Sequence, residues 1–253
     1  MNESGTTFSE ILNDFPKEQD CLIAYIDLLG TKAHMQNNDD FFKDVYTAFS
    51  SAVVACNKAV FFSEHGVKLK IFSDNILIAY PIADMEDKNN VLELFRSMDF
   101  LVRILTVLLL QKNILFRGAI TVNKLTINDV MVWGPGLNEI VDLEENIAIF
   151  PRIIFSDNAI ELLKKSLPNK ESFEKHWLLI LDSDGRYYLD YFDYSSPQQS
   201  KELWANLKNE FTEKINIEKS QRVIQKYAWF LHYLDIVKSK MDLLDKNSRF
   251  RRR

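Results

Sequence analysis

Two aspartates each stand alone in an apolar run. Asp27 is the acid of "CLIAYIDLLG" (residues 21–30), and Asp74 interrupts "KIFSDNILIAY" (residues 70–80). A continuously apolar run is typical of a strand buried on both faces, and "SDN" between two apolar segments is typical of a hairpin bend. We therefore expect each acid at a strand end, where it either forms the turn or binds a metal ion.

Two carboxylates on neighbouring strands can share one or two divalent cations. Oxygen ligands favour Mg²⁺ or Mn²⁺, which keep bound waters and also bind substrate phosphates. A pair of such ions supports phosphoryl transfer, because one activates an attacking oxygen and the other holds the phosphates. The chain turns at Gly30 just after the first acid, and a strand-to-helix turn presents backbone amides suited to a triphosphate.

The elements around these acids predict how they are positioned. Helical spacing follows at residues 38–62 and 89–113, a strand pair is expected at 115–128, and a Gly/Pro turn opens a helix within 130–150. The order βαββαβ predicts a ferredoxin-like α+β fold, an antiparallel sheet with helices on one face. In that sheet the strands of Asp27 and Asp74 are neighbours.

The remaining segments define the expected domain organisation. We expect a helix in residues 1–20, a catalytic α+β domain over 21–195 and a helical C-terminal extension over 196–253 that ends in the basic tail "RFRRR".

Composition narrows the function class. The net charge of -5 provides no general field for nucleic acid. The first 20 residues lack an export signal, and the longest apolar stretch (100–110) is too short to cross a bilayer. Two cysteines without metal-type spacing fit a reducing compartment. We therefore expect a cytoplasmic protein that binds neither nucleic acid nor membrane.

Four motifs resemble, in order and approximate spacing, those of class III nucleotide cyclases. They are "YIDLLG" (25–30), "KIFSDN" (70–75), "LFRGAITVNKL" (115–125) and "WGPGLNEIVDLE" (133–144). Within that family the motif sequences are most similar to those of the pyrimidine cyclases of bacterial Pycsar antiphage systems. The resemblance spans about residues 22–156 and implies the class III version of the ferredoxin-like fold.

The resemblance implies a role for each matching residue. Asp27, Asp74 and the backbone carbonyl of Leu28 match the ligands of two Mn²⁺ or Mg²⁺ ions. The backbone amides that hold the β- and γ-phosphates match three successive residues, Gly30, Thr31 and Lys32. In the family, the 3′-hydroxyl attacks the α-phosphate in line and pyrophosphate leaves, without a protein nucleophile.

The transition-state groups match only in part. Asn138 matches the family's asparagine, but Asp142 stands one helical turn later, where the family has an arginine. Arg117 or Arg152 is a candidate replacement, although neither lies one turn from Asn138. The alternatives are a charge at a strand edge for Arg117 and a cation at a helix end for Arg152.

Base selection is expected to involve Lys70, four residues before the second acid, and Met131, where the family usually has an acid or small polar residue. Lys70 can donate to a uracil carbonyl, whereas Met131 is a very weak acceptor for a purine donor. The sequence therefore favours UTP, converted to 3′,5′-cyclic UMP, over CTP or ATP. Lys70 as an ordinary solvated strand residue remains the alternative.

The family's active sites lie between two subunits, so a homodimer is implied, and the product would be a second messenger in antiviral defence. The rival hypothesis is a catalytically inert cyclase-like module that binds a nucleotide, which the acid at Asp142 would suit.

Overall fold

The structure, a computed structural model, describes residues 17–31, 35, 40–58, 66–167, 179–192 and 196–250. Within these ranges the elements run β1 (Gln19–Leu28), α3 (Phe41–Lys58), β2 (Lys68–Phe72), β3 (Asn75–Pro81), α4 (Lys88–Leu110), β4 (Phe116–Ile127), β5 (Val132–Trp133), α5 (Pro135–Asn146), β6 (Ile153–Phe155), α6 (Asp157–Ser166), β7 (Leu179–Leu181), β8 (Tyr187–Leu189), α8 (Pro197–Ile217) and α9 (Gln221–Phe250). Most of the helix expected at 1–20 lies outside the described residues, and β1 already begins at Gln19.

One sheet organises the described chain. Its strand order is β2-β3-β1-β4-β6-β8-β7, with β5 paired to β4. The paired strands are antiparallel except β4 and β6, which are parallel. The order β2-β3-β1-β4, with helices α3 and α4 as the crossovers, is the ferredoxin-like arrangement. The predicted α+β fold with a mainly antiparallel sheet is therefore confirmed.

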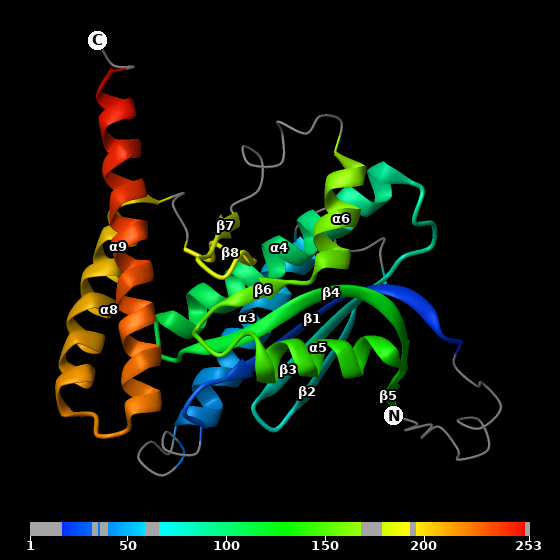
Figure 1. The fold of residues 1–253 in the computed structure, drawn as a ribbon, viewed down its shortest axis with the longest axis horizontal. Helices are drawn as coiled ribbons and strands as arrows, with labels where there is room; N and C mark the ends of the chain where they lie inside the picture. Colours follow the sequence, from blue (N-terminus) through cyan, green and yellow to red (C-terminus); the bar gives the residue numbers. More distant parts are fainter. Residues whose placement is uncertain are drawn as a thin grey trace, which may run out of the picture.

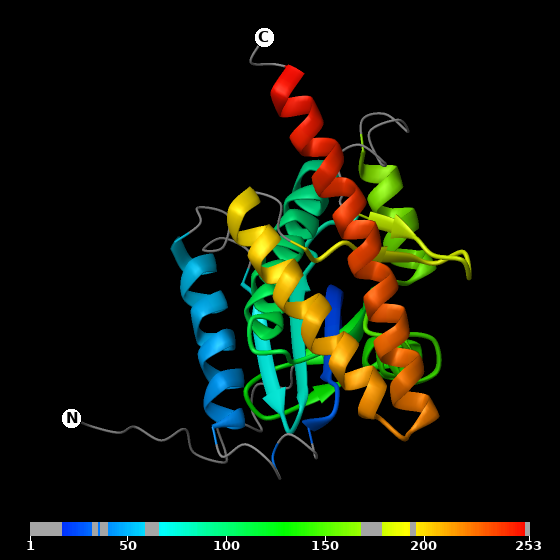
Figure 2. The same ribbon diagram turned by 90° about the vertical axis from the view of Figure 1, so that its left-hand side faces the viewer.

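Helices cover both faces of this sheet (Figures 1 and 2). α3 and α4 share one face, as expected, whereas α5 lies on the opposite face. The reason is that β1 is apolar on both sides, with Leu22 and Ile23 both fully buried. Gly136 allows the close approach of α5, because a Cβ there would lie 2.6 Å from Cδ1 of Ile23 and 2.8 Å from the carbonyl oxygen of Lys124.

The segment expected to form a strand pair is one long strand, β4. Apolar and β-branched residues continue to Ile127, and the chain turns only at Asn128, whose side chain accepts bonds from the amides of Val130 and Met131. The return strand is the two-residue β5. β4 also approaches β1 closely, since a Cβ on Gly118 would lie 2.2 Å from the carbonyl oxygen of Tyr25.

The C-terminal helices α8 and α9 form a pair that packs beside the end of the sheet (Figure 1). Asp190, fully buried after β8, anchors α9: the hydroxyl of Tyr233 donates to its Oδ1 at 2.7 Å and Nζ of Lys240 to its Oδ2 at 2.6 Å. The Tyr233 hydroxyl also accepts from the amide of Phe192 at 3.1 Å. A buried carboxylate is stable only when paired in this way. None of the helices in the described ranges has the length and apolar character needed to cross a bilayer.

Tyr233→Phe is expected to lower the free energy of unfolding by about 2 kcal/mol, because it removes one hydrogen bond to a buried carboxylate and one from a buried backbone amide. Urea unfolding measures the change. The matched control is Tyr46→Phe on the exposed face of α3, where we expect less than about 0.5 kcal/mol. Equal effects at the two positions would contradict the anchoring role.

Candidate functional site: an acidic edge beside α5

The structure brings Asp27 and Asp74 to adjacent positions at one edge of the sheet. Asp27 pairs with Asn75 in the register of β1 and β3, and the amide of Leu28 donates to the carbonyl oxygen of Asp74 at 2.9 Å. Asp74 lies in the tight bend between β2 and β3, next to Ser73, which has a φ of 58°. The two acids are therefore neighbours because the hairpin of Asp74 folds back along β1.

Asp27 forms an ion pair with an arginine of the next strand. Arg117 lies directly opposite it in β4, and its Nε donates to Oδ2 of Asp27 at 3.0 Å. The same Nε lies 2.5 Å from Oε1 of Glu144 in α5, and Nη1 of Arg117 donates to the Glu144 carbonyl oxygen at 3.4 Å. We call Asp27, Arg117 and Glu144 the acid–arginine cluster.

Glu144 is the residue of this cluster that the sequence analysis missed. Its side chain is buried although it is an acid, and it follows Ile140 by one helical turn on the face of α5 that contacts the sheet. An acid at a core-facing helical position is a signal of a buried ion pair. That signal was present in "WGPGLNEIVDLE" but stayed unused.

Burial sets the electrostatics of the cluster. It raises the pKa of Glu144 to about 7, against the effect of Arg117 and with help from the negative charge of Asp27. Burial also raises the pKa of Asp27, which the bond from Arg117 opposes and the charge of Asp74 increases. Desolvation penalises both carboxylates, so a further positive charge near them is favourable.

The oxygen atoms at this edge fit a hard divalent cation. The charge of Asp74 raises the pKa of Asp27, and repulsion between two carboxylates is of the kind that a cation relieves. The Leu28 carbonyl, in the residue after Asp27, is a further candidate oxygen ligand. In the described ranges, no cluster of three or more His, Cys, Asp or Glu side chains has a metal-binding arrangement. Waters and substrate phosphates would complete the coordination, as Mg²⁺ commonly requires.

The turn after Asp27 is described as far as Thr31. Gly30 has a φ of 77°, a left-handed conformation that glycine adopts without strain. Thr31 is buried, and its hydroxyl donates to the Leu28 carbonyl oxygen at 2.8 Å. Lys32 lies outside the described residues.

Asn138 lies near the start of α5, exposed at the edge of a hollow of about 400 Å³. Tyr25 and Phe72 line this hollow from the sheet, and α5 contributes its lining residues Leu137, Asn138, Val141, Asp142 and Glu145. Asp142 accepts a bond from Nδ2 of Asn146 at 2.7 Å. The hollow thus lies between the strands of the two acids and the asparagine helix.

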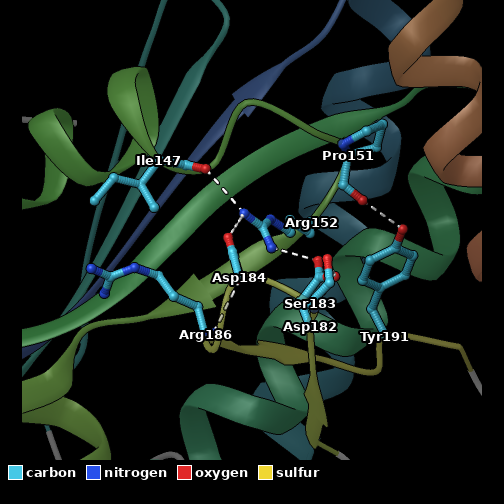
Figure 3. A network of polar contacts seen from close by, with 8 residues as sticks. All are labelled: Ile147, Pro151, Arg152, Asp182, Ser183, Asp184, Arg186 and Tyr191. Atoms are coloured by element: carbon cyan, nitrogen blue, oxygen red, sulfur yellow. Dashed lines mark hydrogen bonds and ion pairs between the residues drawn. The ribbon is translucent and has the colours of Figure 1, made fainter.

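Arg152, the other candidate for the missing arginine, faces the β7–β8 turn (Figure 3). Its guanidinium donates to Asp182 and Asp184, each at 2.5 Å, and to the carbonyl oxygen of Ile147 at 3.2 Å. Arg152 is buried, and its bonds lower the pKa of Asp184. The side-chain hydrogen bonds described for Arg152 therefore hold the β7–β8 turn against the end of α5.

Lys70 lies beside the turn that contains Met131. Its Nζ donates to the carbonyl oxygen of Asp129 at 2.8 Å. Asp129 lies in the turn in which the side chain of Asn128 accepts a hydrogen bond from the amide of Met131. The structure thus places the two residues expected to select the base next to one turn.

Comparisons with known proteins give structural likeness only. No protein-family model matches the chain, and no curated protein matches it. Solved structures similar to it include the adenylyl cyclase CyaB from P. aeruginosa (TM-score 0.45, 14% identity, 59% of this chain and 82% of that one).

Two further solved structures are similar to the same degree. One is the guanylyl cyclase domain of the RhoGC fusion protein from the aquatic fungus Blastocladiella emersonii (0.43, 14%, 69% and 97%). The other is a class III adenylyl cyclase-like ATP-binding protein from Pseudomonas aeruginosa (0.45, 11%, 74% and 40%).

Arg152→Lys is expected to lower the free energy of unfolding by about 3 kcal/mol, because an ammonium cannot bind both acids of the β7–β8 turn as the planar guanidinium does. Urea unfolding measures the loss. The matched control is Arg186→Lys, whose ion pair with the exposed Asp157 is 3.7 Å long, and which should change stability by less than about 0.5 kcal/mol. Unchanged stability with lost turnover would instead indicate a catalytic role for Arg152.

Proposed function

We propose that this protein is a nucleotide cyclase that converts UTP into 3′,5′-cyclic UMP and pyrophosphate at the edge formed by Asp27 and Asp74. The observation that supports this most directly is the backbone bond from Leu28 to Asp74, which joins the ends of two strands that each present a carboxylate. Two adjacent carboxylates beside a glycine turn are the arrangement that a metal–triphosphate complex requires.

The residues of the chain have separable tasks in this reaction. Asp27, Asp74 and the Leu28 carbonyl would hold the divalent cations, which when bound lower the pKa of the 3′-hydroxyl and neutralise charge on the phosphates. Gly30 and Thr31 begin the turn whose amides would orient the β- and γ-phosphates. In the homodimer proposed below, Asn138 of one subunit would donate from a fixed helical position to the ribose or the reacting phosphate held by the acids of the other.

Lys70 and Met131 support the proposal that the substrate carries a pyrimidine base. An ammonium donates to a carbonyl, and uracil presents two carbonyl oxygens, whereas a thioether does not accept well from a purine's amino or ring N–H group. A base entering here would replace the Asp129 carbonyl as the partner of Lys70. CTP and ATP are the alternative substrates that this interaction disfavours.

We also propose a homodimer with its active sites shared between subunits. Exposed apolar side chains lie on β2, on the turn after β4 and on β5: Ile71, Phe72, Val130, Met131 and Trp133. Apolar exposure of this kind, next to the hollow that Phe72 lines, suits a surface covered by a second copy. The antiviral second-messenger role is proposed on the sequence resemblance alone.

A nucleotide-binding module without turnover is the second candidate. The observation in its favour is Asp142, an acid that lies in the hollow one turn after Asn138 where the transition state would need a cation. Both arginines considered as replacements are bound to acids, Arg117 to Asp27 and Glu144 and Arg152 to Asp182 and Asp184.

We expect the purified protein to release pyrophosphate and form a cyclic nucleotide fastest from UTP when given each of the four ribonucleoside triphosphates with Mn²⁺. Asp74→Asn should lower the rate at least about 100-fold, because a metal ligand is lost. The matched control is Asp84→Asn in an exposed loop, which should retain the rate. Turnover of ATP alone would contradict the pyrimidine assignment, and binding without turnover of any triphosphate would favour the module.

Mixing two inactive variants tests the shared site. Asp27→Asn removes a metal acid and Asn138→Ala removes the helix residue, so a mixed dimer keeps one intact site of two. After subunit exchange at equal concentrations, the mixture should recover about a quarter of the wild-type rate, because half of the dimers are mixed. A mixture as inactive as its components would show that each subunit builds its own complete site.

A further inference from the structure

We propose that Arg117 is a displaceable counterion. In the metal-free protein its guanidinium is hydrogen-bonded to Asp27; when a divalent cation binds Asp27, the guanidinium moves to Glu144 and stays paired with it. This proposal concerns the regulation of metal binding and rests on the metal site of the proposed function. It assigns Glu144 as a positioning residue that acts through Arg117.

The hydrogen-bond geometry of the acid–arginine cluster supports two alternative partners for Arg117. Nε has a single N–H, and in this structure it donates to Oδ2 of Asp27 at 3.0 Å. Oε1 of Glu144 lies 2.5 Å from the same nitrogen yet is buried without a hydrogen-bond partner. One N–H cannot satisfy both carboxylates, so a small rotation that breaks the bond to Asp27 would complete the bond to Glu144.

Arg117 is held on the side of Glu144 in either position. Its Nη1 donates to the Glu144 carbonyl oxygen, at the last turns of α5 where helix carbonyls favour a cation. The side chains of Arg117 and Glu144 are only 13% and 4% exposed. A guanidinium released from Asp27 therefore stays paired and does not have to enter solvent, which keeps the cost of displacement low.

A cation at Asp27 competes with Arg117 for the same carboxylate. Asp27 is 17% exposed and Oδ2 is the atom that Arg117 binds. A divalent ion adds charge beside a guanidinium in a poorly solvated site, so the two positive groups repel each other. Metal affinity should therefore depend on how readily Glu144 accepts Arg117.

Lys226 of α9 provides a matched control for charge without contact. Burial and the positive charges of Arg117 and Arg222 lower its pKa, whereas Asp27 and Glu144 raise it. The charges of the acid–arginine cluster thus act on Lys226 through space. Removing it changes the local field by one charge and leaves the bond between Arg117 and Asp27 in place.

The test measures Mn²⁺ affinity without nucleotide, by titration of free Mn²⁺ in electron paramagnetic resonance. We expect Arg117→Met to bind Mn²⁺ about tenfold more tightly than wild type, because the competing guanidinium is gone. Glu144→Gln should bind it about fivefold more weakly, because Arg117 loses its alternative charged partner. Lys226→Met should stay within about twofold of wild type.

Thermal unfolding provides a second measurement. In EDTA, Arg117→Met should melt below wild type, since Asp27 and Glu144 lose their counterion, and Mn²⁺ should raise its melting temperature more than it raises that of wild type. If Arg117→Met does not fold, the charge-balanced double variant Arg117→Met/Glu144→Gln is compared with Glu144→Gln. Tighter Mn²⁺ binding by the double variant supports the proposal.

Several outcomes would overturn the proposal. One is unchanged or weaker Mn²⁺ binding by Arg117→Met. Another is an equal gain in Mn²⁺ affinity in Arg117→Met and Lys226→Met, which would assign the effect to the local electrostatic field alone. Failure of the proposed function has a different signature: the expected Mn²⁺ affinities without turnover of any triphosphate would support the counterion role and contradict the cyclase. Absence of Mn²⁺ binding by wild type, with or without a non-hydrolysable UTP analogue, would contradict both.

Discussion

The pairing of β1 with β4 places a carboxylate opposite a guanidinium, and the candidate site depends on that register. Asp27 faces Arg117 at the end of a strand whose preceding residues are buried on both sides. A shift of one residue would turn Asp27 toward the opposite face and leave a buried charge without its partner. The apolar residues of β1 therefore fix the register that pairs the acid with Arg117 and aligns it with the hairpin of Asp74.

Two arginines that look alike in the sequence have different environments in the fold. Arg117 lies within β4 and contacts Asp27 of β1 and Glu144 of α5. Arg152 lies just before β6 and binds the two acids of the β7–β8 turn. Arg152 is buried and Arg117 is partly buried against paired acids, but only Arg117 is beside a residue proposed to bind metal. Its partner is also the one that we propose to change when a cation binds.

The C-terminal helices are connected to the site through the end of α5. Trp229 of α9 stacks on Phe150, which follows α5 by a few residues, with ring centroids 6.1 Å apart. Lys226 lies one turn earlier on α9 and feels the charges of Asp27 and Glu144. Asp190 anchors the same helix through Tyr233 and Lys240, which both follow Trp229 along α9. The extension is thus part of the surroundings of the acidic edge.

The sequence by itself determined the order of the elements from β1 to α4, the buried first strand and the positions of Asp27 and Asp74 at strand ends. These follow from local patterns: a two-sided apolar run, helical spacing, and turn residues at "SDN" and "WGPG". The same patterns could not place α5 on the opposite face, because that depends on which side of β1 the other helices leave uncovered.

Only the tertiary structure decided what each charged side chain contacts. The acid–arginine cluster joins residues from β1, β4 and α5, and Glu144 contributes through both its carboxylate and its backbone carbonyl. The bonds of Arg152 to Asp182 and Asp184 likewise span some 30 residues of chain. Ion pairs between distant segments leave no periodic trace in a sequence, since either charge alone resembles an ordinary surface residue. A buried ion pair differs from surface charges in its burial, and burial depends on the tertiary fold.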